Sequence, residues 1–524
     1  MPHVTCNEAT GQTPLKLRFS SRHHPMNPTA TTIPIRTSTR PEDVARKRIL
    51  RCLLYVAAGL LLLLTLARVY TGWRAGVAMT ATSGIWTALA VDLKNGVFYR
   101  PLYGDLGYGG TRYFPLHFVL HAALMATGLG PEAAGHALEA VACLALLFGI
   151  YRILRQLGVD RPMAACACLL ALAPKSTQIA YLSIRGDLLP AALNVLGLAI
   201  CMAPRVERRH VLGASLLFTL AFSAKPTSLF GVVAVLLSFL LSGRVRKAME
   251  LLLATGLGCA GVLSVMFLAT EGRVVTIMRA CATAAGFSLL AGVKHLVTWP
   301  AQGLPIDLAF IVLGFAGLFA LPRSKVLSIP ALFFVTTIVE TAVVLGAIGA
   351  NINHFLDLQV AALIVFAAWL FDGATVERNF GIGLLAFVTF FALFPILWTL
   401  RNDDSTAYFD IAYSRGLRDT LQFLGKTDKP LLAANPLLPI LAGQRVYLLD
   451  PWMFAHIASK DPSFGQPMTE AIRGRQFAAI VLEDDLESRT LSTTLPFEQT
   501  REIGKYYQLA KRFPMACVYL PRQP

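Results

Sequence analysis

The sequence predicts an all-α polytopic membrane protein with about eleven transmembrane helices, followed by a small α/β domain at the C-terminal end. Two observations lead to this class. Of the 524 residues, 55% are hydrophobic and only 15% are charged, a balance that soluble globular domains do not have. The apolar residues also gather in runs of about the length that crosses a bilayer, with short polar segments between them.

Residues 1–48 are predicted to be a disordered cytoplasmic tail. Residues 1–45 are rich in Ser, Thr, Pro, Arg and His, and they lack the apolar core and the small-residue cleavage site of a signal peptide. A segment of this composition cannot bury enough apolar surface to fold by itself.

Residues 49–400 are predicted to form the transmembrane domain. Eleven segments approach the length of about 20 apolar residues that a span needs. They are 50–70, 137–154, 163–180, 188–203, 211–223, 227–242, 249–269, 306–322, 328–348, 358–371 and 380–399. Segment 114–130 is apolar too, but it contains two histidines and no basic turn follows it. We expect this segment to lie along the membrane.

The charges of the connecting loops predict the orientation. If segment 114–130 does not cross, the loops on the N-terminal side are RILRQLGVDRP, RVERRH, GRVRK, RSK and VER. Cytoplasmic loops are basic in this way, so we expect the N-terminus in the cytoplasm and the C-terminal domain outside the inner membrane. Much of the formal net charge of +16 then reflects topology, and no nucleic-acid partner is expected.

Residues 401–524 are predicted to form the small extracytoplasmic α/β domain. Helices are expected near 408–424 and 466–475. Strands are expected in the stretches KPLLAAN, RVYLLD, QFAAIVLED and CVYLP.

The first outer loop, residues 71–136, is expected to carry function, because keeping so long a loop ordered is costly. Its sequence predicts an amphipathic helix from Ser83 to Lys94, a glycine turn, an aromatic and glycine-rich stretch, and a second helix from about Pro115. The polar candidates in this loop are Asp92, Arg100, Asp105, Arg112, Tyr113 and His117. Asp92 has a plainer interpretation as part of a solvated helix face, and Asp105 as a turn residue.

Three further polar groups are predicted at the same outer edge. Arg185 and Asp187 open a span, although Asp187 could simply cap the helix. Lys225 stands at a break between two short apolar runs, where it could bind a lipid phosphate or extend its ammonium to the surface. Asn353, His354 and Asp357 enter another span, and the last two share a helix face. Ionisable residues this close to hydrocarbon usually mark a site, but a helix end that faces water is the alternative.

Taken in order, these stretches resemble a known group of enzymes. The loop contains YRPL and YFPLHF, and RGDLL, FSAKPT, NINHFLDL and ANPLLPILAGQRVYLLDPWMFAHIA follow it. The order, over roughly residues 50–490, is similar to that of bacterial membrane glycosyltransferases of the GT-C fold. That group includes protein O-mannosyltransferases and the aminoarabinose transferases of lipid A.

The resemblance implies a polyprenyl-phosphate-linked sugar as donor, a lipid, polysaccharide or protein as acceptor, and an acidic base in the first outer loop. The usual acidic position holds Thr82-Ser83 here, so the expected base is Asp92 or Asp105. Lys225, Arg185 and Arg112, together with Asp187, are expected at the donor phosphate. The expected substrate pocket contains Tyr113, His117, Asn353, His354 and Asp357.

Other readings stay open at this point. The nine cysteines lie mostly within apolar runs without metal-ligand spacing, and a divalent cation is the only cofactor that the acids and histidines leave open. A multi-pass transporter or lipid flippase is one alternative function. Transporters often show inverted repeats, and none is visible here. A non-catalytic relative of the glycosyltransferases is the other alternative.

Overall fold

The computed structural model describes residues 41–75, 80–303, 305–372, 376–394, 396–397, 411–487, 494–514 and 516–523. The chain divides into two compact units, Met1–Ala45 and Arg46–Pro524, and the description below concerns the second. Residues 1–40 of the predicted tail lie outside the described residues. Residues 41–48 are helical, because the first helix begins at Pro41.

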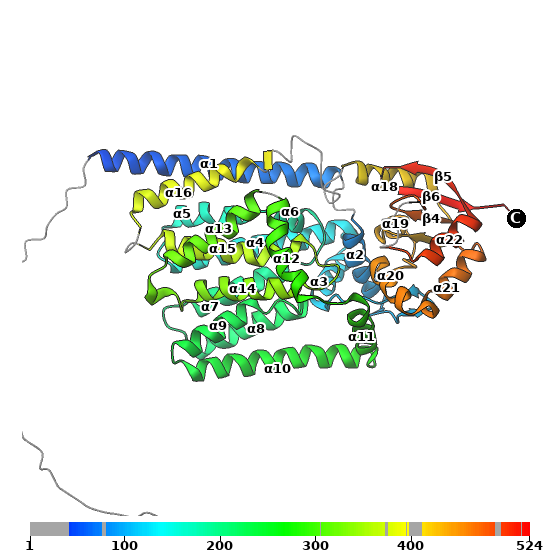
Figure 1. Cartoon of the computed structure of the whole chain (residues 1–524), viewed down its shortest axis with the longest axis horizontal. Helices are drawn as coiled ribbons and strands as arrows, with labels where there is room; N and C mark the ends of the chain where they lie inside the picture. The colour runs from blue at the N-terminus through cyan, green and yellow to red at the C-terminus, as the bar shows by residue number, and fades with distance from the viewer. Residues whose placement is uncertain are drawn as a thin grey trace, which may run out of the picture. The chain divides into compact units, whose positions relative to one another are not determined.

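The unit is built mainly from helices (Figure 1). Those of the N-terminal half are α1 (Pro41–Ala75), α2 (Ala81–Lys94), α3 (Pro115–Ala126), α4 (Pro131–Gln156), α5 (Arg161–Leu169), η1 (Leu170–Leu172), α6 (Lys175–Leu182), α7 (Leu188–Cys201), α8 (Arg208–Ala224), α9 (Phe230–Leu241) and α10 (Val245–Ala269). They are followed by α11 (Arg273–Ala285), α12 (Leu289–Gly303), α13 (Pro305–Ala320), η2 (Arg323–Lys325), α14 (Ile329–Leu345), η3 (Ile352–Phe355), α15 (Leu356–Leu370) and α16 (Arg378–Phe391).

Within the described residues, each of the eleven segments predicted as spans overlaps a helix or a helix pair. Among the described residues, four helices are long and apolar enough to cross a bilayer alone: Val44–Arg74, Pro131–Gln156, Val245–Ala269 and Ile352–Leu370. A fifth span results if Arg161–Leu172 and Lys175–Leu182, which meet at 81°, cross together. The chain is therefore a multi-pass membrane protein, and the number of eleven spans stays a prediction.

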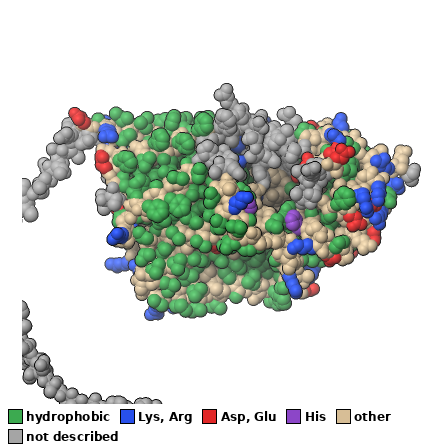
Figure 2. Space-filling model, viewed as in Figure 1, with side chains coloured by type: hydrophobic (Ala, Val, Ile, Leu, Met, Phe, Trp, Pro, Cys, Tyr) green, Lys and Arg blue, Asp and Glu red, His purple; other side chains and the backbone are tan. Residues whose placement is uncertain are grey.

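Two of these helices differ sharply in their surroundings. α15 is packed against α13, α14 and α4, and 83% of its apolar stretch is buried. Only 17% of the apolar stretch of α10 is buried, and its exposed large hydrophobic side chains are Leu, Val, Met and Phe. Figure 2 shows hydrophobic side chains over much of the helical region, with charged side chains gathered toward the two ends. In a membrane protein, such an apolar surface faces lipid.

The helices of the first outer loop form as predicted. Thr80 caps α2 by accepting a hydrogen bond from the Ser83 backbone N–H at 3.2 Å, as N-cap threonines do. The apolar face of α2, with Trp86 and Leu89, packs on α3. The helix ends at a turn in which Gly96 has a φ of 82°. α3 begins at Pro115, the predicted position.

The C-terminal part contains a four-stranded sheet in the order β3-β4-β6-β5. Its elements are α18 (Ile411–Leu424), β3 (Leu431–Ala433), α19 (Leu437–Leu441), α20 (Pro451–Lys460), α21 (Pro462–Arg473), β4 (Ala479–Leu482), α22 (Phe497–Tyr506), β5 (Tyr507–Phe513) and β6 (Ala516–Pro521). β3 and β4 are parallel, and the other neighbours are antiparallel. Three of the four predicted strand stretches contain β3, β4 and β6, whereas β5 was not predicted.

The prediction of a strand in RVYLLD, residues 445–450, is wrong. This stretch does not join the sheet, because its backbone bonds to the first outer loop instead. In that loop, β1 (Tyr103–Gly104) and β2 (Gly107–Tyr108) form a short hairpin. The Tyr108 N–H donates to the Tyr447 carbonyl at 2.7 Å, and the Leu449 N–H donates to the Tyr108 carbonyl at 3.0 Å. Arg46–Pro524 is accordingly one compact unit, and the predicted boundary at residue 401 stays a prediction.

Candidate active site

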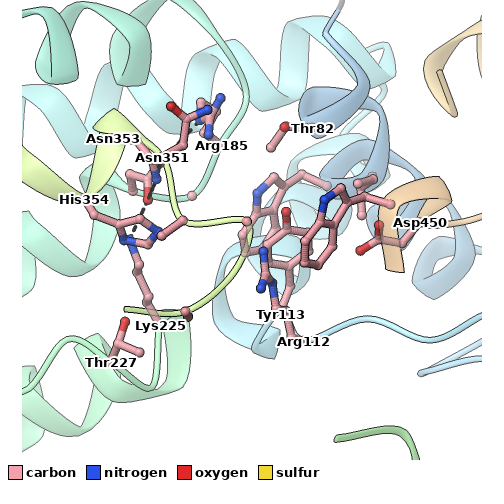
Figure 3. Close-up of a pocket in the computed structure, with 18 of the residues that line it drawn as sticks. Thr82, Arg112, Tyr113, Arg185, Lys225, Thr227, Asn351, Asn353, His354 and Asp450 are labelled. Carbon is pink, nitrogen blue, oxygen red and sulfur yellow. Dashed lines mark hydrogen bonds and ion pairs between the residues drawn. The ribbon is translucent and has the colours of Figure 1, made fainter. Parts of the chain in front are cut away.

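A cavity of about 430 Å³ opens where the first outer loop, the helix ends and the C-terminal part meet. Figure 3 shows polar side chains that line it, which come from separate stretches of the chain. These lining residues include Thr82, Trp86, Arg112, Tyr113, Arg185, Asp187, Lys225, Thr227, Asn351, Asn353, His354, Asp450 and Trp452. Seven of the eleven site residues predicted from the sequence, Tyr113 among them, line this one cavity.

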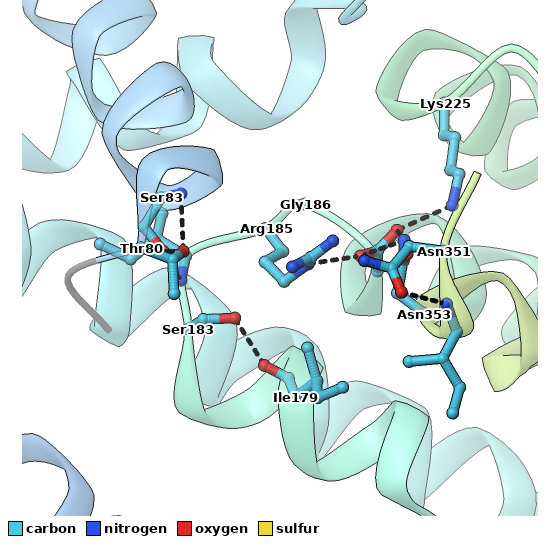
Figure 4. Close-up of polar contacts among 12 residues, drawn as sticks. Thr80, Ser83, Ile179, Ser183, Arg185, Gly186, Lys225, Asn351 and Asn353 are labelled. Atoms are coloured by element: carbon cyan, nitrogen blue, oxygen red, sulfur yellow. Dashed lines mark hydrogen bonds and ion pairs between the residues drawn. The ribbon is translucent and has the colours of Figure 1, made fainter. Parts of the chain in front are cut away.

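Asp187 is the centre of the polar contacts. Its Oδ1 accepts from Lys225 Nζ at 2.7 Å, and its two oxygens lie 3.0 and 2.9 Å from Asn353 Nδ2. Arg185 Nε lies 3.5 Å from Oδ2. Figure 4 shows the side chains of Arg185, Lys225 and Asn353 converging there. Asp187 stands at the N-cap position of α7 but makes no capping hydrogen bond, so capping does not explain this residue.

The charge of Asp187 is stabilised by its neighbours. Burial by itself would raise the pKa of this carboxyl, but Lys225 and Arg185 outweigh burial and lower the pKa to about 2. An ionised carboxylate between two cations holds their side chains in fixed positions. The position of Lys225 itself follows from the sequence, because the residue before a proline is disfavoured in helical conformation. α8 therefore ends at Ala224, and Lys225 is extended before Pro226.

The backbone before Asp187 is held by groups that the sequence did not point to. Glu139 Oε1, wholly buried in α4, accepts from the N–H groups of Arg185 at 3.0 Å and Gly186 at 2.9 Å. Gly186 has a φ of 65°, and a Cβ there would lie 2.9 Å from the Trp86 ring. Only glycine fits that backbone without strain. Ser83 Oγ accepts from the Ile184 N–H at 3.2 Å, so α2 fixes the same turn.

Aromatic rings form the middle of the cavity. Trp86 and Tyr113 stack with ring centroids 4.3 Å apart, and the Arg112 guanidinium lies over the Trp452 ring at 4.8 Å. Aromatic walls combined with fixed polar groups are typical of small-molecule pockets. Tyr113 and Arg112 both line the cavity, and the Arg112 guanidinium lies against its aromatic wall. Their predicted roles, Arg112 at the donor phosphate and Tyr113 in the substrate pocket, stay predictions.

Asp450 is a lining residue that sequence reasoning missed. It caps α20, where Oδ1 accepts from the Met453 N–H at 3.0 Å, and only 4% of the residue is exposed. Burial raises its pKa, against the opposing effects of the backbone hydrogen bond and of Arg112. Its place on the cavity depends on the pairing of residues 447–449 with Tyr108, which no local pattern indicates.

The two acids predicted as catalytic bases lie elsewhere. Asp92 lies six residues after Trp86, the last residue of α2 that lines the cavity. Six residues span about 9 Å along a helix. Its carboxylate is bound by Arg100 through Nε at 2.5 Å and Nη2 at 2.6 Å. Arg100 also donates to the Val446 carbonyl, so this pair joins the loop to the C-terminal part. Asp105 is exposed in the turn between β1 and β2.

Two predicted pocket residues lie behind the cavity wall. His117 is fully buried, and its Nε2 contacts Glu139 Oε1 at 3.0 Å. Its ring packs edge-on against Trp86 at 4.7 Å. Asp357 is 6% exposed in α15 and is not among the lining residues. Asn353 and His354 do line the cavity. Within the part of the chain that is described, no three His, Cys, Asp or Glu side chains are grouped as metal ligands.

No family model and no curated protein matches the sequence, but solved structures with a similar fold exist. ArnT from Cupriavidus metallidurans bound to undecaprenyl phosphate aligns with a TM-score of 0.52 and 13% identity, over 87% of this chain and 97% of that one. Its apo state aligns with a TM-score of 0.51. The apo Archaeoglobus fulgidus oligosaccharyltransferase aligns with a TM-score of 0.51 and 11% identity, over 90% of this chain and 74% of that one. At these identities the likeness concerns the fold, and the fold of this chain is that of the GT-C membrane glycosyltransferases.

Proposed function

We propose that the protein is a glycosyltransferase that moves a sugar from a polyprenyl-phosphate-linked donor to an acceptor at the outer face of the cytoplasmic membrane. The observation that carries this proposal is the cavity in which Lys225 and Arg185 converge beside Asp187. A similar fold in ArnT holds undecaprenyl phosphate. Lys and Arg are the side chains that bind phosphate best.

The cations would act on the leaving group. When the bond from the sugar to the phosphate breaks, negative charge develops on the phosphate oxygens. Lys225 and Arg185 are fixed in advance by Asp187 and need little rearrangement to meet that charge, which is the condition for effective electrostatic catalysis. Asn353 and His354 lie at the same side of the cavity (Figure 3) and would contact the phosphate or the sugar.

An apolar path for the lipid tail begins at the cavity. Ala347 lines the cavity and pairs with Phe287 in an isolated β-bridge. From Phe287 onward, exposed apolar side chains run along α12: Leu289, Leu290, Val293 and Val297. We propose that the polyprenyl chain leaves the cavity along this surface, where apolar contact with the lipid would be retained.

The proposed sidedness uses the loop charges. With the N-terminus in the cytoplasm, the basic loops face inward and the cavity faces the outer side, beneath the C-terminal part. The acceptor would then be a lipid, a polysaccharide or a protein of the cell envelope.

One observation favours a second candidate, a relative that binds the donor without transferring its sugar. Thr82 lines the cavity at the position where the resemblance implies an acid, and a threonine hydroxyl is a poor base at neutral pH.

The test uses the full chain purified in detergent. It is given undecaprenyl phosphate linked to labelled glucose, galactose, mannose or aminoarabinose, with an envelope lipid extract as acceptor. Release of undecaprenyl phosphate together with label in the acceptor is the expected result, and detergent excludes transport as its cause. Binding of undecaprenyl phosphate without turnover of any donor would identify the non-catalytic relative. No binding would refute both candidates.

A further inference from the structure

Resting on the proposed function, we infer that Asp450, supplied by the C-terminal part, is the general base that accepts the proton of the acceptor hydroxyl. Glycosyl transfer needs a base near that hydroxyl. Thr82 cannot serve, and Asp92 and Asp105 are not among the residues that line the cavity. The acidic side chains among the described lining residues are Asp187 and Asp450.

The contacts of the two acids separate their roles. The carboxylate of Asp187 contacts Lys225 and Arg185, and both of its oxygens accept from the Asn353 amide. Its oxygens are therefore engaged by two cations and an amide. A carboxylate held in this way is a weak base. The Asp450 carboxyl is instead engaged by backbone groups, those of Met453, which donates to Oδ1 at 3.0 Å, and Trp452. Among the described residues, no cationic side chain forms an ion pair with it. Asp450 is therefore the lining acid better suited to receive a proton.

The position of Asp450 also suits the reaction. In Figure 3, Lys225 and His354 lie at one side of the cavity and Asp450 at the other, with Tyr113 and Arg112 between them. A sugar in the aromatic middle would have its phosphate toward Lys225 and its other side toward Asp450. The base and the leaving group would then flank the reacting carbon, as a direct displacement requires.

The Asp450 carboxylate takes the proton of the acceptor hydroxyl while that oxygen forms a bond to the anomeric carbon. The bond from the anomeric carbon to the phosphate oxygen breaks, and its electron pair leaves on the polyprenyl phosphate, next to Lys225 and Arg185. The products are the glycosylated acceptor, polyprenyl phosphate and protonated Asp450, which releases its proton to water.

The position of Asp450 is fixed by long-range contacts. Leu448 forms a parallel bridge with Tyr108. The Tyr108 hydroxyl in turn donates to the Phe464 carbonyl and accepts from the Met468 N–H, both at 3.0 Å. A catalytic group needs such rigid support to stay within reach of its substrate. The first outer loop would thus contribute to catalysis by holding Asp450, which belongs to the C-terminal part, in position.

The test is Asp450→Asn, because asparagine caps helices as well as aspartate does. Asp461→Asn is the matched control, since Asp461 also caps a helix of the C-terminal part, α21, and is exposed outside the cavity. Both variants are assayed from pH 5 to 9 for release of undecaprenyl phosphate from the donor that wild type uses. Binding of undecaprenyl phosphate and thermal unfolding are measured alongside.

We expect Asp450→Asn to lose at least 100-fold in transfer rate, within the range of a general base, with binding and unfolding temperature unchanged. Its residual rate should lose the acidic limb of the wild-type pH profile, and Asp450→Glu should recover part of the rate. Asp461→Asn should match wild type. If Asp450→Asn transfers within threefold of wild type, the inference is overturned while the proposed function stands. If wild type releases no undecaprenyl phosphate from any donor, both fail together.

Discussion

Asp92, which is half-buried, and Asp187, which is buried, are both carboxylates bound by cations, yet their pKa values shift in opposite directions. Burial raises the pKa of Asp92 although Arg100 binds it at both oxygens. The pKa of Asp187 is lowered to about 2, because Lys225 and Arg185 together outweigh burial. At Asp92 the effect of burial exceeds that of Arg100 and Arg445, whereas at Asp187 Lys225 and Arg185 exceed the effect of burial. The Asp92–Arg100 pair holds the first outer loop against the C-terminal part, whereas Asp187 holds Lys225 and Arg185 beside the cavity.

The strongest test of this difference is Lys225→Ala. Removing the ammonium takes away the cation proposed for the leaving phosphate, and we expect transfer to fall by about 10²–10³-fold, as when one stabilising donor is removed from an active site. Release of undecaprenyl phosphate by the purified variant measures the effect. Lys325→Ala is the matched control, because Lys325 also pairs with an aspartate, Asp372 at 3.0 Å, far along the sequence and outside the cavity. Wild-type turnover in Lys225→Ala would remove Lys225 from the mechanism.

A smaller effect on transfer is expected from Asp187→Asn. The amide still occupies the site but no longer fixes Lys225 and Arg185, so we expect transfer to drop by about tenfold. Wild type should also be more stable than the variant by about 2 kcal/mol near pH 6, given an unfolded pKa near 3.9. A lowered acid pKa stabilises the fold above the unfolded pKa, so the difference should shrink as the pH falls from about 4 toward 2. Thermal unfolding in detergent at several pH values measures it, and a difference that grows on acidification would contradict the assignment.

Asp92→Asn should separate stability from activity. The substitution leaves Arg100, 3% exposed, without its carboxylate. Breaking a buried pair in this way costs about 3 kcal/mol. We expect a lower unfolding temperature with transfer within threefold of wild type, measured on the fraction that stays folded. A loss of 100-fold or more without a change in stability would restore Asp92 as the base.

Asp105→Asn should have the smallest effect. Asp105 is exposed in a hairpin turn, and asparagine serves such turns as well as aspartate does. Both the transfer rate and the unfolding temperature should equal those of wild type. A clear loss of transfer would show that the turn reaches the acceptor.

Much of the helical fold could be predicted because its signals are local. Apolar runs such as 249–269 indicate a helix without reference to any partner, and a proline after Lys225 ends α8 wherever the helix lies. Strand predictions were wrong or missing where the pairing partner determines whether a segment becomes a strand. RVYLLD is apolar enough for a strand, but its backbone bonds to Tyr108 instead. β5 is largely exposed and charged, and it is a strand because β6 supplies its hydrogen bonds.

The class of molecule and the polar residues at the predicted outer edge can be read from short stretches, because hydrophobicity and charge are local properties. Lys225, Arg185, Asp187 and His354 stand out in this way because charge near hydrocarbon is costly wherever it occurs. Which acids face the cavity depends instead on how the helices and loops pack together. Asp92 turns to Arg100, and Asp450 is carried to the cavity by contacts with a loop more than 300 residues earlier. Such contacts depend on how distant segments pack, and no single segment encodes them.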